Sequence, residues 1–271
     1  MVITSTGNNQ VKDVMNLKKK ASERRKRGLF ILEGERIVAE TPADRLEKLY
    51  VSESYLAVHG GSTLALAREH DGEAAWAECG IVSDRVFQTM ADTQNPQGVL
   101  AVARMRECRA GELLDLDPQT APVFVVLEHL QDPGNLGTIL RTAEGAGVRA
   151  VLMSEDTVDI YNPKVIRATM GSLFRVPFAY VEDFGGLLIR MKEKGIRLCA
   201  AHLAGEHDYF EEDYTVPTAF LIGNEGNGLS DETAALADLK VKIPMEGRLE
   251  SLNAAVSAAL FMYEAKRQRR R

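Results

Sequence analysis

The second half of the chain alternates continuous apolar runs with segments of helical periodicity, and this alternation constrains the fold more than any other feature. The run APVFVVLEHL, residues 121–130, has the unbroken hydrophobicity of a strand buried on both faces of a parallel sheet. Further strands are expected in RAVLMS, RLCAAHL, TAFLIG and LKVKIP, with helices at 136–144, 162–170, 184–194 and 252–266. The pattern predicts an α/β domain whose helices flank a parallel sheet and whose ligands bind beyond the carboxyl ends of the strands.

The first half predicts a smaller α/β unit. Apolar residues recur at helical spacing between Asn8 and Lys20, and a loop through the basic stretch then leads to a strand at Leu29–Leu32. Short strands are also expected in EKLYVSE, CGIVSD and GVLAVARM. Two prolines and scattered charges after residue 108 indicate a linker. We therefore expect one domain over residues 1–108, a linker over 109–120 and a second domain over 121–271.

Composition excludes several classes of protein. With 45% hydrophobic residues among 271, the chain has ample material for a packed core. No stretch is long and apolar enough to span a membrane, so we expect a cytoplasmic protein with no membrane partner. The cysteines Cys79, Cys108 and Cys199 form no C-x-x-C pair, and no histidine lies at metal-ligand spacing. Neither a disulfide framework nor a metal site is expected.

Charge is distributed unevenly along the chain. The net charge is −6, yet residues 1–30 contain eight basic and two acidic side chains. Seven of the eight lie close together: Lys18, Lys19, Lys20, Arg24, Arg25, Lys26 and Arg27. Such a cluster either binds phosphates or forms a solvated helix face, and the charges alone favour the second interpretation.

A first polar loop follows the strand at 121–130. In LEHLQDPGNLGTILRTAEGAGV, residues 127–148, a glycine-containing turn leads into a helix. The Asn135 amide can donate and accept hydrogen bonds, and Arg141 offers a planar fork of donors to a phosphate or carboxylate. A helix cap followed by a surface arginine explains the segment equally well. His129, near the same strand end, and His202 are interpreted as structural.

A second loop, TAFLIGNEGNGLSDETAALAD at 218–238, holds three glycines before a helix capped by Ser230. Glycine-rich turns of this kind often hold phosphates, but the spacing G-x-x-G-x-G fits neither common phosphate motif and no lysine accompanies it. Glu225 would repel a phosphate placed among the glycine amides, whereas a phosphate-free cofactor with a positive sulfonium meets no such repulsion. The loop therefore favours a cofactor such as S-adenosylmethionine.

A third loop lies in KVKIPMEGRLESLNAAVSAALFMYEAKRQ, residues 240–268. Ser251 and Asn253 flank Leu252 at the start of an alanine-rich helix, and Ser251 could simply cap it. The small alanine side chains would allow another helix to pack closely. A core helix is the more frequent explanation, and a dimer interface is the alternative.

The three loops contain, in this order, the patterns N-x-G-x-x-x-R, G-N-E-G-N-G-L and I-P-M-x-G-x-x-x-S-L-N. Together these patterns closely resemble the three motifs of the SpoU/TrmH family of RNA 2'-O-methyltransferases, in the SPOUT superfamily. The pattern S-x-x-N-x-x-V-K followed by FILEGERIV resembles the ribosomal-protein-like α/β domain with which many members hold RNA. The resemblance implies a deep trefoil knot in the C-terminal domain, S-adenosyl-L-methionine as cofactor, and a homodimer formed through that domain whose sites are often completed by a partner arginine.

The resemblance also implies roles for particular residues. Main-chain groups around Gly223, Ile243 and Leu252 would hold adenine and ribose, beside a wall formed by Leu221, Ile222 and Met245. The positions grouped at the reaction centre are Asn135, Arg141, Glu225, Ser251 and Asn253. Arg141 stays protonated, so we expect it to anchor the adjacent phosphate and stabilise the developing alkoxide while a phosphate oxygen or water takes the proton.

The implied reaction is methyl transfer to a ribose 2'-hydroxyl of RNA, with 23S rRNA as the expected substrate and tRNA as the alternative. Within such a family the basic segment 18–27 is better explained as a phosphate contact than as a solvated face. Two other readings are a non-catalytic RNA-binding relative and a nucleotide-dependent α/β enzyme that binds phosphate at Gly223. Cofactor titration and methyl-transfer assays separate these readings.

Overall fold

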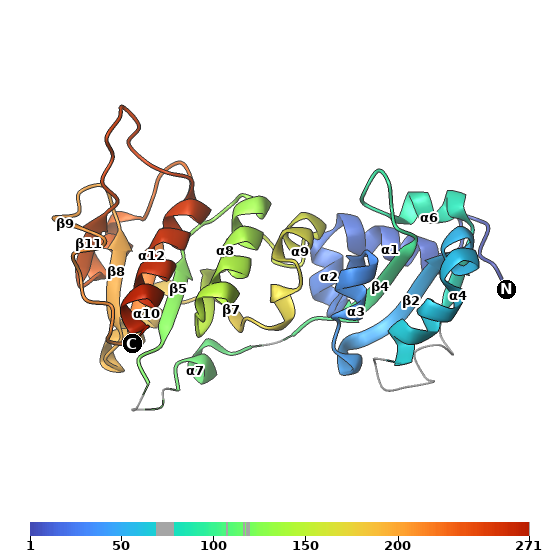
Figure 1. The fold of residues 1–271 in the computed structure, drawn as a ribbon, viewed down its shortest axis with the longest axis horizontal. Helices are drawn as coiled ribbons and strands as arrows, with labels where there is room; N and C mark the ends of the chain where they lie inside the picture. Colours follow the sequence, from blue (N-terminus) through green and yellow to red (C-terminus); the bar gives the residue numbers. More distant parts are fainter. Residues whose placement is uncertain (69–78, 107, 116, 118–119, 271) are drawn as a thin grey trace. The chain divides into compact units, whose positions relative to one another are not determined.

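The computed structural model describes residues 1–68, 79–106, 108–115, 117 and 120–270 (Figure 1). Contacts between Cα atoms divide the chain into two compact units. Unit 1 comprises Met1–Arg106 and Tyr161–Phe174, and unit 2 comprises Glu107–Ile160 and Arg175–Arg271. The segment Tyr161–Phe174 lies within the range expected for the second domain but groups with unit 1 by its contacts. No described helix is both long enough and apolar enough to cross a membrane.

Unit 1 is built on a four-stranded sheet in the order β1-β4-β2-β3. Its strands are β1 (Leu29–Glu33), β2 (Leu46–Ser52), β3 (Gly80–Val82) and β4 (Val99–Arg104). Its helices are α1 (Asn9–Lys19), α2 (Ala21–Arg27), α3 (Glu35–Ala39), α4 (Glu53–Arg68), α6 (Asp84–Met90) and α9 (Pro163–Thr169), with short 3-10 turns at Ala43–Arg45 and Ser172–Phe174. Val11, Val14 and Leu17 of α1 are buried in one hydrophobic core with strand residues of this sheet, which confirms the amphipathic helix predicted from their spacing.

The basic stretch after α1 forms a helix, although a loop was expected there. Residues 21–27 make up α2, and Gly28 ends it in the left-handed conformation with φ 63°. Arginine and lysine favour helical backbone, and a glycine at this φ is the usual helix terminator. The stretch has too few apolar residues to show helical periodicity. The helix was therefore missed, although the helix propensity of its residues favours one.

Unit 2 contains a seven-stranded sheet in the order β7-β6-β5-β10-β8-β11-β9, and every neighbouring pair is parallel. Its strands are β5 (Val123–Leu127), β6 (Ala150–Ser154), β7 (Phe178–Val181), β8 (Arg197–Ala201), β9 (His207–Asp208), β10 (Thr218–Ile222) and β11 (Leu239–Lys242). The parallel sheet predicted from the apolar runs is confirmed. The two edge strands β7 and β9 were not predicted. β9 has only two residues, both polar, and the apolar run at 176–181 that contains β7 includes Pro177, which argues against a central strand.

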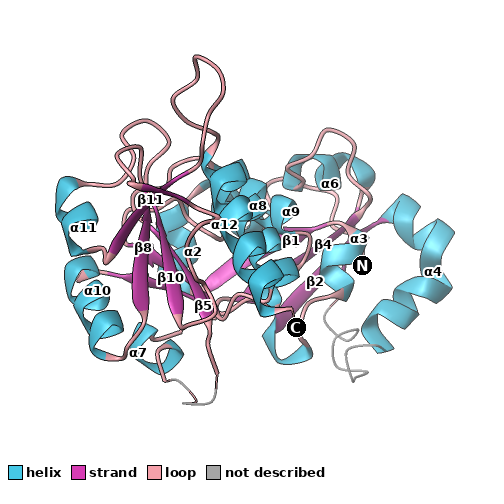
Figure 2. Ribbon diagram, turned by 60° about the vertical axis from the view of Figure 1, so that its left-hand side comes forward, coloured by secondary structure: helices cyan, strands magenta, loops and turns pink. Residues whose placement is uncertain are grey.

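Helices cover both faces of this sheet. They are α7 (Ala110–Leu113), α8 (Pro133–Ala146), α10 (Phe184–Glu193), α11 (Asp231–Leu236) and α12 (Ala254–Arg269). In Figure 2, α10 and α11 lie on one side of the strands and α8 and α12 on the other. Side chains alternate along a strand, so Phe124 and Val126 join the core beneath α10.

The expected linker, residues 109–120, begins with the single turn α7; its positions 116 and 118–119 lie outside the described residues. The carboxyl ends of β5, β10 and β11 lie along one edge of the parallel sheet. The three loops singled out in the sequence follow these three strands. The topology therefore brings together segments that are more than 100 residues apart in the sequence.

Candidate active site

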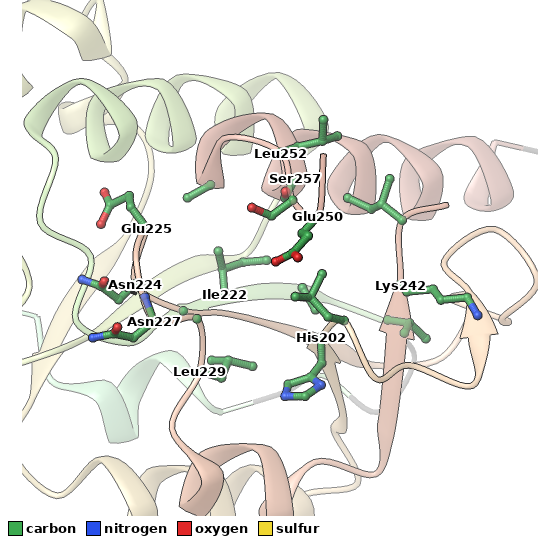
Figure 3. A pocket seen from close by; sticks show the side chains of 18 of the residues that line it. His202, Ile222, Asn224, Glu225, Asn227, Leu229, Lys242, Glu250, Leu252 and Ser257 are labelled. Carbon is green, nitrogen blue, oxygen red and sulfur yellow. Dashed lines mark hydrogen bonds between the residues drawn. The ribbon is translucent and has the colours of Figure 1, made fainter. Parts of the chain in front are cut away.

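A cavity of about 260 Å³ opens at this edge, between the strand ends and the start of α12 (Figure 3). Seven of the predicted site residues line it: Ile222, Gly223, Glu225, Ile243, Met245, Ser251 and Leu252. Leu221 does not line it. Its side chain is buried in the core on the α10 face, because neighbouring side chains along β10 point to opposite faces.

The loop after β10 folds back on itself at Gly223. Asn224 and Gly228 exchange backbone hydrogen bonds of 2.9 Å in each direction, and the Asn224 side chain accepts from the N–H groups of Gly226 and Asn227. A Cβ at Gly223 would lie 2.0 Å from the carbonyl carbon of Gly228. Glycine is therefore required at position 223 by the close approach of two backbone segments.

The far end of the same loop is fixed by Glu128, which was not predicted from the sequence. This carboxylate is buried and accepts hydrogen bonds from the Ser230 N–H (2.8 Å), the Ser230 hydroxyl (2.7 Å) and the Thr233 hydroxyl (2.6 Å). Ser230 in turn caps α11, as expected. The sequence offered one signal for Glu128. It directly follows five apolar strand residues, and a carboxylate buried at such a position needs several hydrogen-bond donors.

Asn135 links two of the loops to the start of α8. Its amide Nδ2 donates to Glu225 Oε1 at 3.0 Å, and its Oδ1 accepts from Asn253 Nδ2 at 2.9 Å. Glu225 also accepts from the backbone N–H groups of Asp132 (2.9 Å) and Gln131 (3.1 Å). Three of the five residues expected at the reaction centre thus form one hydrogen-bonded chain.

This network determines the charge state of Glu225. Partial burial raises the pKa of the Glu225 carboxyl, but the hydrogen bonds from the Asn135 amide and from backbone N–H groups outweigh burial and hold the pKa below its usual value. Glu225 is therefore a carboxylate at neutral pH. It occupies the donors at the start of α8 that would otherwise attract a phosphate.

The third loop differs from expectation at the beginning of α12. Asn253 caps this helix by accepting from the N–H groups of Ala255 (2.9 Å) and Val256 (3.3 Å). The cap is therefore Asn253 and not Ser251, which is exposed and lines the cavity. The Asn253 side chain uses its oxygen for the cap and its nitrogen for Asn135, so one residue orients both elements.

Arg141 stands apart from the other four reaction-centre residues. It is exposed on α8 and does not line the cavity, and its side chain forms no hydrogen bond or ion pair with any other described residue. Its guanidinium is available to a ligand that approaches from outside this chain.

The two histidines interpreted as structural differ in their surroundings. The His129 N–H donates to Ser154 Oγ (2.9 Å), its ring contacts the Asp156 carboxylate, and its carbonyl accepts from Asn224 Nδ2 (2.8 Å). His129 thus ties together the ends of three strands. His202, by contrast, lines the cavity, and sequence reasoning gave it no place in the site.

The seven basic residues of the segment 18–27 do not form one uniform surface. Arg24 is buried, and its guanidinium donates to the carbonyls of Leu17 (2.7 Å) and Lys18 (3.2 Å) at the end of α1. The Lys18 ammonium donates to two carbonyls at the end of α6, and Arg27 pairs with Asp13 at 3.1 Å. The exposed members without a partner among the described residues are Lys19, Lys20, Arg25 and Lys26.

Comparison with known proteins matches these features to a family. The model described as the SpoU rRNA Methylase family matches residues 122–263, more than half of the chain. The chain belongs to the SpoU rRNA methylase family. A second model, described as the MRM3-like substrate binding domain, matches residues 8–101 of the SpoU chain. The predicted family, the predicted α/β fold and the predicted methyltransferase class are thereby confirmed.

Relatives cover nearly the whole of this SpoU methylase. The 23S rRNA (guanosine(2553)-2'-O)-methyltransferase RlmP of Bacillus subtilis is 31% identical over 96% of this chain and 97% of its own length. The crystal structure of an rRNA methyltransferase from Sinorhizobium meliloti is 32% identical, has a TM-score of 0.84, and covers 99% of this chain and 98% of that one. The SpoU methyltransferase AviRb from Streptomyces viridochromogenes, solved in complex with the cofactor AdoMet, is 28% identical with a TM-score of 0.82, covering 97% of this chain and 99% of that one.

Proposed function

We propose that this SpoU methylase transfers a methyl group from S-adenosylmethionine to a ribose 2'-hydroxyl of ribosomal RNA. S-adenosylmethionine is the cofactor of the family, as the sequence predicted, and two solved relatives are complexes with it. The observation that carries the proposal is the chain Glu225–Asn135–Asn253 beside a cavity lined by carboxylates. This arrangement suits a cationic cofactor without phosphates and disfavours a nucleotide.

The resemblance to the family implies an adenosyl position at Gly223, Ile243 and Leu252, and all three residues line the cavity. We assign their main-chain groups to adenine and ribose, with Ile222 and Met245 as apolar wall. The network through Asn135 joins the three loops before any ligand binds, and such preorganisation is how many sites accelerate reactions. When bound, the cofactor supplies a methyl group that its sulfonium has already activated.

The acceptor hydroxyl must be aligned with the methyl group and must lose its proton as the new bond forms. The exposed Arg141 guanidinium is assigned to the phosphate next to the target ribose, where it also stabilises the developing alkoxide. A phosphate oxygen or water takes the proton, since a guanidinium stays protonated at neutral pH.

Methyl transfer from tritiated S-adenosylmethionine to 23S rRNA, with tRNA in parallel, tests the function. We expect labelled rRNA whose modified nucleotide resists alkaline cleavage at its 3' side, because a 2'-O-methyl group blocks that hydrolysis. Arg141→Lys keeps the charge but loses the fork of donors, so we expect about a hundredfold lower transfer. Base methylation, transfer to tRNA alone, or an Arg141→Lys variant of full activity would each contradict the corresponding part of the proposal.

Ribosomal RNA is favoured over tRNA by the extent of the similarity. Relatives named as 23S rRNA 2'-O-methyltransferases include RlmP, which matches across both halves of the chain. The TrmH/SpoU tRNA modifying enzyme of A. aeolicus covers only 59% of this chain, with a TM-score of 0.50. We therefore assign residues 1–108 to holding rRNA, residues 109–120 to a linker and residues 121–271 to the methyltransferase domain.

Within the RNA-holding domain we propose that Lys19, Lys20, Arg25 and Lys26 contact phosphates. The double variant Arg25→Glu/Lys26→Glu should bind RNA about tenfold more weakly, with a slope of log affinity against log salt reduced by about 2. The matched control is Arg149→Glu/Lys240→Glu, which reverses two exposed charges in unit 2. Fluorescence anisotropy with an rRNA fragment measures both. Equal losses in the two double variants would assign the effect to overall charge.

We also propose that the chain forms a homodimer through its C-terminal domain. A groove on α8 and α12 exposes apolar side chains, including Val256 at 48% and Tyr263 at 50%, and a second copy would bury them. Light scattering should then give twice the mass of one chain, and the monomer mass would refute the dimer.

We further propose that the C-terminal segment threads the domain as a trefoil knot. An experimental structure whose C-terminal segment passes through no loop would exclude the knot.

A further inference from the structure

The cavity contains a second carboxylate that differs from Glu225 in its partners. Glu250 lines the cavity, and Figure 3 shows its carboxylate directed inward, near Ile222 and Ser257. Glu225 accepts hydrogen bonds from three donors. Glu250, in contrast, has no hydrogen bond or ion pair with any described residue. The cavity thus offers one uncompensated negative charge to whatever it binds.

The basic side chains of the lining do not neutralise this charge. Lys242 and His202 are the basic residues that line the cavity among those described. In Figure 3 the Lys242 ammonium points away from Glu250, and no ion pair joins Glu250 to Lys242 or to His202. Several of the nearby walls are apolar, including Ile222, Leu229 and Leu252. A carboxylate next to such surfaces is stabilised by a cation more strongly than it would be in bulk water.

We propose that Glu250 is the counter-charge for the sulfonium of the cofactor, and that it lets the enzyme discriminate S-adenosylmethionine from its product S-adenosylhomocysteine. The inference rests on the cofactor assigned under the proposed function. The two molecules share the adenosine, the ammonium and the carboxylate, and differ by the methyl group and its positive charge. An interaction that depends on this charge therefore appears only in the affinity for the substrate.

The consequence for turnover follows from the loss of that charge. Once the methyl group has left, Glu250 no longer attracts the sulfur, so the product is held less tightly than the substrate. Glu250 is exposed, and Coulomb attraction over a few ångströms near a protein surface corresponds to about a tenfold preference. Glu250 is in this sense a specificity residue for the methyl donor and takes no part in proton transfer.

Isothermal titration of the intact protein with each of the two cofactor forms tests the proposal. Glu250→Gln preserves shape and removes charge, so the affinity for S-adenosylmethionine should fall about tenfold while that for S-adenosylhomocysteine stays within about twofold. Glu250→Asp should retain most of the preference. Glu246→Gln is the matched control, because Glu246 is exposed in the same loop and does not line the cavity. In the unmodified protein, added salt should weaken the preference, and in Glu250→Gln it should not.

The possible outcomes separate this inference from the proposed function. If Glu250→Gln lowered the affinities for both ligands equally, Glu250 would contact a group common to the two molecules, and the proposal would be overturned. Unchanged affinities for both would also overturn it. If the unmodified protein binds neither ligand, the cofactor assignment itself fails.

Discussion

Replacing Asn135 by aspartate should lower methyl transfer by about a hundredfold, the scale on which the loss of one preorganised hydrogen bond acts. The new carboxylate would stand where the Asn135 amide now donates to Glu225 at 3.0 Å. Two carboxylates at this distance cannot both stay ionised, so either one binds a proton or the loops separate. Because the chain of hydrogen bonds continues to Asn253, separation would also displace the start of α12.

The same variant should change the pH dependence. In the unmodified protein the pKa of Glu225 lies below its usual value, since its hydrogen bonds outweigh its burial. A depressed pKa in the folded state stabilises the fold fully above the unfolded value of about 4.5, and this contribution is lost as the pH falls through the folded pKa. In Asn135→Asp the pKa of Glu225 rises, so the acidic limb of the rate profile should move to higher pH.

Two further variants show whether charge repulsion causes the loss of activity expected in Asn135→Asp. Asn135→Ala removes the donor without adding charge and should lose less activity than Asn135→Asp. The double variant Asn135→Asp/Glu225→Gln exchanges the two groups, so that the amide at position 225 donates to the carboxylate at position 135. Its thermal stability should therefore recover in part. Activity close to normal in Asn135→Asp would show that the network has no part in the reaction.

Four strands of unit 2, β5, β6, β8 and β10, could be predicted because each contains a continuous buried run. β5 and β10 are five-residue strands with every residue buried, and burial on both faces produces the apolar runs seen in the sequence. β7 has only four residues and lies at the sheet edge. The apolar run that contains it, residues 176–181, includes Pro177, and a proline within such a run argues against a central strand.

The site could be predicted only where a residue's type restricts its surroundings. Glu225 was identified because a carboxylate conflicts with a phosphate loop, and its position beside the cavity agrees with that argument. Glu128 was missed because its partners Ser230 and Thr233 lie more than 100 residues away. Arg24 looks like its neighbours in the sequence, yet it alone of the segment is buried. Tertiary packing decides such differences, and a local pattern does not encode them.

Gly223→Ala should abolish detectable cofactor binding, lowering affinity by at least about a hundredfold, and should reduce the free energy of unfolding by about 1–3 kcal/mol, the range for overpacking. The added Cβ would lie 2.0 Å from the carbonyl carbon of Gly228 and 2.2 Å from the Leu229 nitrogen. These are backbone atoms, which a rotamer change cannot move. The loop must open, and the paired hydrogen bonds between Asn224 and Gly228 must break.

Gly226→Ala is the matched control in the same loop. A Cβ there would meet only the Asn224 side chain, at 3.4 Å, which is ordinary contact. Calorimetry with S-adenosylmethionine and thermal melts should therefore show a large effect at 223 and a small one at 226. The contrast assigns the effect to backbone approach, because both substitutions add one methyl group to a glycine beside the cavity. Comparable losses in both variants would instead mean that the cofactor needs space throughout the loop, and normal binding by Gly223→Ala would show that the loop opens at little cost.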